Sequence, residues 1–365
     1  MKLRELATFL ESLAPLAYQE DYDNSGLIIG DPDKEVTGAL ISLDCTEAVV
    51  DEAIAMGYNL VISHHPIVFR GIKKFTGKSY VERVVMKAIK NDIALFAIHT
   101  NLDNVLEGVN KKICNKLGVV NPRILKPRVG ALKKLVTFCP DVDAERVRNA
   151  MFEAGAGGIG NYSECSYNTS GFGTFKAGLG ANPHVGEIGK IHNESEVRIE
   201  TIYPAIIEQK LIAALFEAHP YEEVSYDLYP ISNSYMQVGS GMIGNLENDQ
   251  DEMTFLKLIK EKLNTKVIRH TAVRGKKIRR VAVCGGAGSF LLNNAITAGA
   301  DIFVTSDFKY HEFFDAEGKL IIADVGHFES EQFTQELLLE LITEKFSNFA
   351  LRLTTQSTNP INYLI

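Results

Sequence analysis

The chain has 365 residues, of which 45% are hydrophobic and 23% are charged, and its formal net charge is -8 at pH 7. This composition is typical of a soluble globular protein, and the length predicts two or three domains. The negative net charge argues against a broad nucleic-acid surface, because binding to the phosphate backbone needs concentrated Lys and Arg. The short basic stretch 274–280 is interpreted as the solvated approach to a strand.

No run in the sequence approaches the roughly 18 apolar residues needed to span a bilayer. The N-terminus begins an amphipathic helical pattern instead of an apolar signal segment. The five cysteines are scattered and form no Cys-x-x-Cys pair, which argues against a disulfide framework or a zinc knuckle. We therefore expect a cytoplasmic protein without a membrane partner.

Residues 1–127 are predicted to alternate between strands and helices, which indicates an α/β layer with a largely parallel sheet. In such sheets, ligand-binding groups gather at the carboxyl ends of the strands. The expected strands are 36–43, 59–63 and 94–98, and the expected helices are 46–56, 80–90 and 109–117.

Residues 239–365 repeat this plan, since segments 57–63 and 299–305 match in register. We infer a weak internal duplication, in which two similar α/β half-units pair in one sheet system with a cleft between them. The alternative is that any two strand-helix-strand units look alike at this level. The expected strands are 280–284, 302–305 and 320–323, and the expected helices are 290–297 and 332–346.

Residues 128–238 follow a different order, strand-helix-strand-strand-helix-strand. This order predicts a small α+β, ferredoxin-like domain inserted into the parent domain. The predicted organisation is a first half-unit at 1–127, the inserted domain at 128–238 and a second half-unit at 239–365. Within the insert, strands are expected at 132–138, 197–202 and 224–228, and helices at 143–154 and 204–218.

Polar side chains follow two of the strands predicted in the first half-unit. His64 and His65 come directly after one strand, and His99 and Asp103 follow the next. Neighbouring side chains of a strand point to opposite sides, so the histidine pair can address two different points. Taken alone, the pair is equally consistent with metal ligands and with ordinary polar groups at a strand end.

His327 and Glu331 begin the last predicted helix and, being four positions apart, share one helix face. The alternative is a loop histidine followed by a capping carboxylate. Combined with the polar groups of the first half-unit, they supply more nitrogen and oxygen ligands than one tetrahedral ion needs, and such ligands suit zinc, manganese or ferrous iron. Two ions roughly 3.5 to 4 Å apart would use these ligands in a hydrolytic site.

The glycine string 285–288 follows a predicted strand and precedes a helix. It lacks the Gly-Lys-Ser/Thr of a P-loop. It would either cradle a phosphate on its N–H groups or form a tight turn. His184, His192 and His219 of the insert have no ligand spacing, and we expect structural or surface roles for them.

Four motifs resemble, in order and spacing, the Nif-three-like family (NGG-interacting factor three), whose bacterial members are named GTP cyclohydrolase I type 2 homologues. The resemblance covers most of the chain, and the motifs together are highly specific. They are Asp23-Asn24-Ser25-Gly26-Leu27, Ile62-Ser63-His64-His65-Pro66, His99-Thr100-Asn101-Leu102-Asp103 and Gly326-His327-Phe328-Glu329-Ser330-Glu331.

The resemblance implies a dinuclear metal centre in which Glu331 bridges the ions and His99 lies nearby, either supporting the ligands or facing the substrate. In a hydrolase we expect His99 to be the catalytic group that transfers a proton. It also implies paired α/β half-units in ring-shaped homohexamers, with the middle segment as a PII/CutA-like domain. This chain has Tyr22 where the family often has Trp, and it carries the insert that short members lack. The implied metal ligands are His64, His65, Asp103, His327 and Glu331.

The expected function is a metal-dependent hydrolase of a small, nucleotide-like substrate, of the GTP cyclohydrolase type by resemblance. It would use two divalent ions per subunit, with zinc expected first and Mn²⁺ or Fe²⁺ as alternatives. The alternative function is a non-catalytic metal-binding regulatory or scaffold assembly with the insert as its effector domain.

Overall fold

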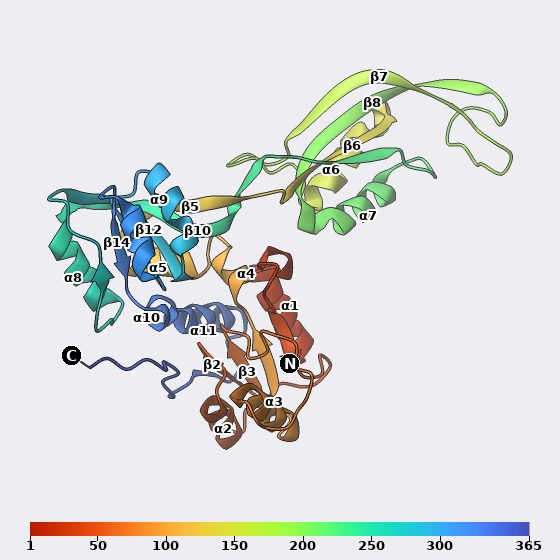
Figure 1. The fold of residues 1–365 in the computed structure, drawn as a ribbon. Coiled ribbons are helices and arrows are strands. Elements are labelled where there is room, and N and C mark those ends of the chain that lie inside the picture. Colours follow the sequence, from red (N-terminus) through yellow and green to blue (C-terminus); the bar gives the residue numbers. More distant parts are fainter. Residues whose placement is uncertain (365) are drawn as a thin grey trace. The chain divides into compact units, whose positions relative to one another are not determined.

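The computed structural model describes residues 1–364, which form a mixed α/β fold with three sheets (Figure 1). The chain divides into two compact units. Unit 1 combines Met1–Lys126 with the chain from Gln237 onward, and unit 2 comprises Pro127–Met236. Within the described residues, no helix has the length and apolarity needed to cross a membrane.

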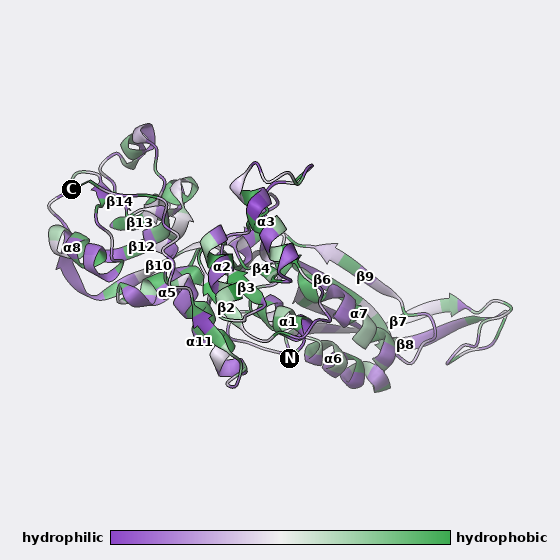
Figure 2. Cartoon of the chain, turned by 90° about the horizontal axis from the view of Figure 1, so that it is seen from below, coloured by the Kyte–Doolittle hydropathy of each residue, from purple (hydrophilic) through white to green (hydrophobic). Residues whose placement is uncertain are grey.

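The first sheet of unit 1 has the strand order β1-β4-β3-β2-β15. Its strands β2, β3, β4 and β15 run parallel, and β1 is antiparallel to β4. Every residue of β2, β3 and β4 is buried, as expected for central strands covered on both faces. Figure 2 shows hydrophobic residues concentrated along these strands. The strands are β1 (Gly26–Ile29), β2 (Ala39–Ser42), β3 (Leu60–Ser63), β4 (Ala94–Ala97) and β15 (Leu351–Leu353).

The second sheet of unit 1 has the order β11-β14-β13-β12-β10-β5. Strands β12, β13 and β14 are parallel, β10 is antiparallel to β12, and β11 is antiparallel to β14. The strands are β5 (Val119–Val129), β10 (Ser234–Asp251), β11 (Arg269–His270), β12 (Lys277–Ala287), β13 (Ile302–Ser306) and β14 (Ile321–Asp324).

The helices of unit 1 come from both ends of the chain. In the first part they are α1 (Leu3–Leu13), α2 (Glu47–Ala55), α3 (Tyr80–Lys90), α4 (Thr100–Asp103) and α5 (Val109–Lys116). In the second part they are α8 (Glu252–Lys262), α9 (Leu292–Thr297), α10 (His327–Glu331) and α11 (Thr334–Lys345).

The two sheets of unit 1 exchange strands. Strand β5 follows the first half of the chain but pairs with β10 in the second sheet, whereas β15, near the end of the chain, pairs with β2 in the first. The interpretation as one sheet system therefore needs correction, because the halves form two separate sheets, each completed by a strand from the other half. Local periodicity contains no information about such long-range pairing.

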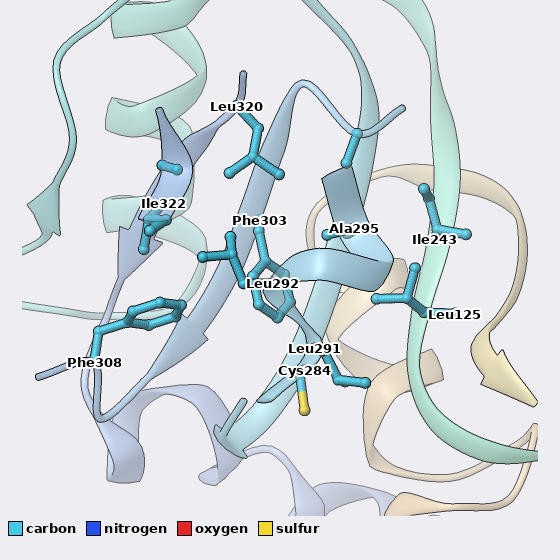
Figure 3. Close-up of a cluster of buried hydrophobic side chains, with 13 residues drawn as sticks. Leu125, Ile243, Cys284, Leu291, Leu292, Ala295, Phe303, Phe308, Leu320 and Ile322 are labelled. Carbon is cyan, nitrogen blue, oxygen red and sulfur yellow. The ribbon is translucent and has the colours of Figure 1, made fainter. Parts of the chain in front are cut away.

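A hydrophobic cluster joins α9 to the strands of the second sheet (Figure 3). Phe303, the second residue of β13, is completely buried, and its ring centroid lies 6.3 Å from that of Phe308. Leu292 and Ala295 of α9 pack into the same cluster. This packing holds β13 and β14 in place. Strand β13 leads into the loop that begins at Asp307, and β14 leads into the turn before α10.

Unit 2 has the element order β-α-β-β-α-β and one antiparallel sheet with the strand order β7-β8-β6-β9. Its core packs α6 and α7 against the sheet. Strand β7 was not located from the sequence, because its residues are mostly polar or glycine and show no apolar alternation. The elements are β6 (Leu132–Pro140), α6 (Ala144–Glu153), β7 (Ser166–Lys176), β8 (Ile191–Pro204), α7 (Glu208–Ala218) and β9 (Tyr226–Pro230).

Most predicted elements of unit 1 are confirmed within a few residues, and α3 matches its prediction at both ends. The last helix differs, since the expected single helix 332–346 is preceded by a separate short helix, α10. Gln332 and Phe333 separate α10 from α11. His327 and Glu331 are therefore the first and last residues of their own helical turn.

Replacing the buried ring of Phe303 should destabilise unit 1. Phe303→Ala removes a fully buried side chain and leaves a cavity, so we expect the free energy of unfolding to fall by about 3–5 kcal/mol. Urea denaturation followed by circular dichroism, with a separate transition for each unit, measures this change. Phe314→Ala is the control, because that ring is 64% exposed. Equal destabilisation by both substitutions would contradict the role of this cluster.

Candidate metal centre

The predicted site residues lie at the carboxyl ends of β3, β4 and β14, as expected for parallel strands. The histidine pair follows β3, His99 and Asp103 begin and end the turn of α4 after β4, and His327 and Glu331 begin and end α10 after β14. The structure brings all three segments together. The side chains that meet are His64, His65, His99, Asp103, His327 and Glu331.

His64 is fully buried, and its Nδ1 lies 2.8 Å from the carbonyl oxygen of Ile98. A carbonyl only accepts hydrogen bonds, so Nδ1 carries the proton and Nε2 presents a lone pair. This Nε2 lies 3.7 Å from Asp103 Oδ1 and 3.8 Å from Glu331 Oε1. Neither His64 Nε2 nor Asp103 Oδ1 finds a hydrogen-bond partner among the described residues. Two buried acceptors facing each other are costly unless a cation lies between them.

His65 and His327 meet at the same carboxylate from two different segments. Each ring places its Nε2 3.0 Å from Glu331 Oε2, and the two Nε2 atoms are 3.4 Å apart. On its other side, His65 Nδ1 lies 2.8 Å from Asp44 Oδ1, and His327 Nδ1 lies 2.6 Å from Asp307 Oδ2. A carboxylate on Nδ1 fixes the ring orientation and directs Nε2 inward, as in many metal-binding histidines.

The donor atoms form overlapping groups that would hold a metal ion, with all atoms of a group within 4.8 Å of one another. One group contains His65, His327 and Glu331, and a second contains His64, Asp103 and Glu331. Glu331 belongs to both, with Oε2 facing the first group and Oε1 facing the second. A third group combines the two neighbouring histidines with His99.

The charges in the site depend on one another. Burial lowers the pKa of His64 to about 4, although Glu331 opposes this, so the ring is neutral at pH 7. Burial and the nearby Glu331 raise the pKa of Asp103 well above its usual value. Burial would also raise the pKa of Glu331, but the charge of His327 and hydrogen bonds from His327 and His65 lower it. Burial disfavours protonated His65 and His327, yet their carboxylate partners raise their pKa values to about 9 and about 11.

His99 is positioned by Asp23, a residue to which the sequence analysis gave no role. His99 Nδ1 lies 2.7 Å from Asp23 Oδ1, and the Asp23 side chain is completely buried. Asp23 also accepts hydrogen bonds from the backbone N–H and the hydroxyl of Thr100. Burial alone would raise the pKa of Asp23, but the hydrogen bond from His99 holds it far below its usual range. This leaves Nε2 of His99 as the ring atom available to a ligand.

The three carboxylates that orient the histidines were missed as site residues. Asp44 comes two residues after β2, and Asp307 directly follows β13, so both lie at strand ends, where ligand groups were expected. Their position at strand ends was the feature of the sequence that could have identified them as site residues. Asp23 lies before β1 and could be noticed only as part of its motif.

The glycine string gives space to Glu331. A Cβ atom on Gly286, whose φ is +62°, would overlap the Glu331 carboxylate. Its N–H donates to the hydroxyl of Ser330 at 2.9 Å, and that of Gly285 donates to Asn110 Oδ1 at 2.9 Å. The interpretation as a phosphate cradle is wrong for these two positions, because their N–H groups already have partners within the protein.

A cavity of about 390 Å³ lies beside the histidines. Its polar side includes His65, His99 and His327, and its apolar walls include Phe69 and Phe328. The segment after β15 contributes the remaining wall, 359–361, which the sequence analysis did not connect with the site. The hydroxyl of Thr358, in the same segment, donates to Asp44 Oδ2 at 2.7 Å. The end of the chain therefore supports a carboxylate that orients His65.

The remaining predicted histidines lie in unit 2, apart from these groups. His219 Nε2 lies 2.9 Å from the carbonyl oxygen of Phe138, and His192 Nε2 lies 2.7 Å from Glu194 Oε2. Within residues 1–364, none of His184, His192 and His219 belongs to a group with metal-ligand spacing.

Comparison with known proteins identifies the family. The family model for Duf34/NIF3 (NGG1p interacting factor 3) matches residues 1–360. The chain belongs to the DUF34/NIF3 family. The resemblance based on the four motifs is thereby confirmed.

Relatives of this NIF3 family protein match over nearly their whole length. Proteins named GTP cyclohydrolase 1 type 2 homolog are 34% identical in Bacillus subtilis, covering 99% of this chain and 98% of theirs, and 37% identical in Halalkalibacterium halodurans, covering 97% and 96%. The crystal structure of a Bacillus cereus protein related to NIF3 is 39% identical with a TM-score of 0.86, covering 100% of this chain and 99% of its own. A Staphylococcus aureus structure has 31% identity and a TM-score of 0.79 over the same shares.

A methyl group at Gly286 should disturb the site more than the same change at a comparable glycine. Gly286→Ala combines left-handed backbone strain with overlap of Glu331, whereas Gly275→Ala, at φ +71°, adds only the strain because no atom lies within 4 Å. We expect each to lose about 1 kcal/mol from strain and Gly286→Ala to lose a further 1–3 kcal/mol from overlap. Thermal unfolding of both variants measures the difference. Equal losses would show that Glu331 does not depend on the glycine.

Proposed function

We propose that this protein binds two divalent metal ions per subunit and is a metal-dependent hydrolase. The observation that carries the proposal is the sharing of Glu331 by two groups of donor atoms, one with His65 and His327 and the other with His64 and Asp103. The unpartnered Nε2 of His64 and Oδ1 of Asp103 support the second ion, because a cation between them would satisfy both atoms. The space left by Gly286 supports the bridging position of Glu331.

The donor set fits the proposed ions. Imidazole nitrogens and carboxylate oxygens suit Zn²⁺ first, with Mn²⁺ or Fe²⁺ as alternatives. When bound, a pair of such ions would make water a nucleophile near neutral pH and polarise the bond under attack. Asp44 and Asp307 would hold His65 and His327 as neutral ligands, each by a hydrogen bond to Nδ1.

His99 is the proposed catalytic proton-transfer group. It lines the cavity, and Asp23 fixes its ring through Nδ1 while Nε2 stays available. An imidazole held in this way would donate a proton to a leaving group or accept one from water. The buried Asp23 would stabilise the protonated ring as it forms, because its carboxylate stays charged.

The proposed substrate is a small nucleotide-like molecule. The names of the relatives support a GTP cyclohydrolase-type reaction, in which hydrolysis opens the imidazole ring of guanine and releases formate. The apolar rings of Phe69 and Phe328 on the cavity wall would suit a planar heterocycle.

We further propose cytoplasmic homohexamers whose metal sites face an interior cavity, and a ferredoxin-like, PII/CutA-like fold for the insert. The insert proposal is supported by the element order of unit 2 and by its strand order, β7-β8-β6-β9. The proposed domains are the half-units 1–127 and 239–365 and the insert 128–238. The first half-unit and the second would share the metal centre, since each supplies part of the donor set.

A non-catalytic metal-binding regulatory or scaffold assembly is the second candidate function. It is favoured by a cavity of about 700 Å³ within unit 2, larger than the one beside the histidines, which suits an effector domain. Under this alternative, metal would change assembly or partner binding without turnover of any substrate. Identical assembly states and identical partner binding of metal-free and loaded protein would contradict the alternative.

Metal binding should release protons and strengthen as pH rises. With pKa values of about 9 and about 11, His65 and His327 are protonated at pH 7 in the metal-free protein, and an ion must displace these protons. We therefore expect affinity to increase from pH 6 to pH 8. Calorimetric titration in two buffers of different ionisation enthalpy measures the released protons, and heats that do not depend on the buffer would contradict this assignment.

The same titration tests the number of ions. Wild-type protein should bind two ions per subunit, and Asp103→Asn should bind one tightly, because it removes a donor from the group with His64 but not from the group with His65. Elemental analysis of the purified, loaded proteins checks the stoichiometry. Two tightly held ions in Asp103→Asn would contradict the proposed ligand role.

His99→Gln should lower turnover of GTP at least a hundredfold while leaving two ions bound, since His99 is proposed to move protons rather than to hold metal. Formate release from metal-loaded protein is the measurement, and His311→Gln, at an exposed position, is the control. Wild-type turnover no higher than that of Asp103→Asn would contradict the GTP reaction. The hydrolase proposal would fail if screens of phosphoesters, nucleotides and amides gave no product with verified metal occupancy.

A further inference from the structure

The cavity in unit 2 is formed entirely by residues of that unit. It runs along β7 and β8, the two long strands in Figure 1, and is bounded by the loop after β7 and by the segment 221–225. The backbone N–H of Asn182, in that loop, donates to Glu222 Oε1 at 2.8 Å. This hydrogen bond joins the two walls, so the cavity is a built feature of the unit.

Glycines in β7 keep the cavity open. Gly171 and Gly173 are two positions apart, so they lie on one face of the strand, and Gly171 pairs with Glu196 of β8. A Cβ on Gly173 would overlap the Glu196 carboxylate, whereas a Cβ on Gly171 would meet no atom within 4 Å. Glycine weakens a strand interior and often marks the close approach of a ligand. The two glycines therefore favour a space that another molecule fills.

One carboxylate is held in place within this space. Tyr221 donates its hydroxyl hydrogen to Glu196 Oε1 at 2.9 Å. The second oxygen, Oε2, faces the strand at Gly173, where no side chain competes for it. Both Tyr221 and Glu196 line the cavity. Glu196 therefore presents a fixed negative charge to whatever enters.

Aromatic rings surround this carboxylate. Phe138, Phe175 and Tyr221 line the cavity, and Phe175 lies on the same face of β7 as Gly171 and Gly173. Faces of aromatic rings attract organic cations, because the π-systems are negative at their centres.

The local charge balance favours a cation. Glu222 and Glu223 line the cavity together with Glu196. Lys176 and Arg198 also line it, and the Arg198 guanidinium lies over the ring of Phe138 and is paired with Glu200 at 2.9 Å. The carboxylates thus exceed the uncompensated positive charge.

We propose that unit 2 binds a small organic ammonium ion that carries an apolar group. The ammonium pairs with Glu196 and contacts the ring of Tyr221, and the apolar part covers Phe175. This site is separate from the metal centre, and its occupancy does not depend on metal or on turnover.

Calorimetric titration of the full-length protein with three probes tests the proposal. The probes are 2-phenylethylammonium, the neutral 2-phenylethanol and the anionic 3-phenylpropanoate, which share a phenyl group and differ in charge. We expect saturable binding of the ammonium, one per chain, at least tenfold tighter than either of the others. Absence of ammonium binding, or equal affinity for the three probes, would overturn the proposal.

Two variants with a matched control locate the site. Glu196→Gln should weaken ammonium binding at least tenfold, and Gly171→Leu should abolish it, because the new side chain fills the cavity without overlap at Cβ. Gly158→Val is the control, since Gly158 is also open around its Cβ but does not line the cavity. Circular dichroism verifies that each variant folds. Wild-type affinity in folded Glu196→Gln and Gly171→Leu would overturn the assignment.

Discussion

The buried carboxylate of Glu331 is the constraint on which the rest of the site depends. It has 3% exposure, and its two oxygens face different sets of donors, so removing either set would leave a buried charge without compensation. The carboxylate therefore constrains its surroundings in two ways. Gly286 must lack a side chain to leave room, and His65 and His327 must direct Nε2 inward, which Asp44 and Asp307 ensure. The need to accommodate and compensate Glu331 therefore explains Gly286 and the two carboxylates that orient the histidines.

The fold provides these groups from two sheets. Strands β3 and β4 place His64, His65 and Asp103, whereas the second sheet places His327 and Glu331 through α10. The two sets must keep a fixed separation for donor atoms to remain within reach of one ion. The exchange of β5 and β15 between the sheets serves that need, since each half of the chain is hydrogen-bonded into the sheet of the other.

Sequence reasoning could locate the donors because each follows a strand whose apolar run is visible locally. His64 and His327 are 263 positions apart, but both lie at the carboxyl ends of parallel strands. Because ligand-binding groups gather at these ends in α/β sheets, the two residues could be predicted to belong to one site. Asp23 and Thr358 could not be found in this way. Their roles come from hydrogen bonds to His99 and Asp44 across long separations in sequence, with no periodic pattern nearby. For the same reason the strand exchange and the glycine-rich β7 were missed.

The chemistry of the site also limits what it can recognise. Among the described residues that line the cavity beside the histidines, none is Lys or Arg. In the metal-free state the positive charge comes from His65 and His327, which compensate Glu331. Binding of divalent ions would exchange these two protons for a greater positive charge at the same place. An anionic substrate would therefore be attracted mainly to the metal-loaded protein, so recognition of charge and activation of water would depend on the same ions.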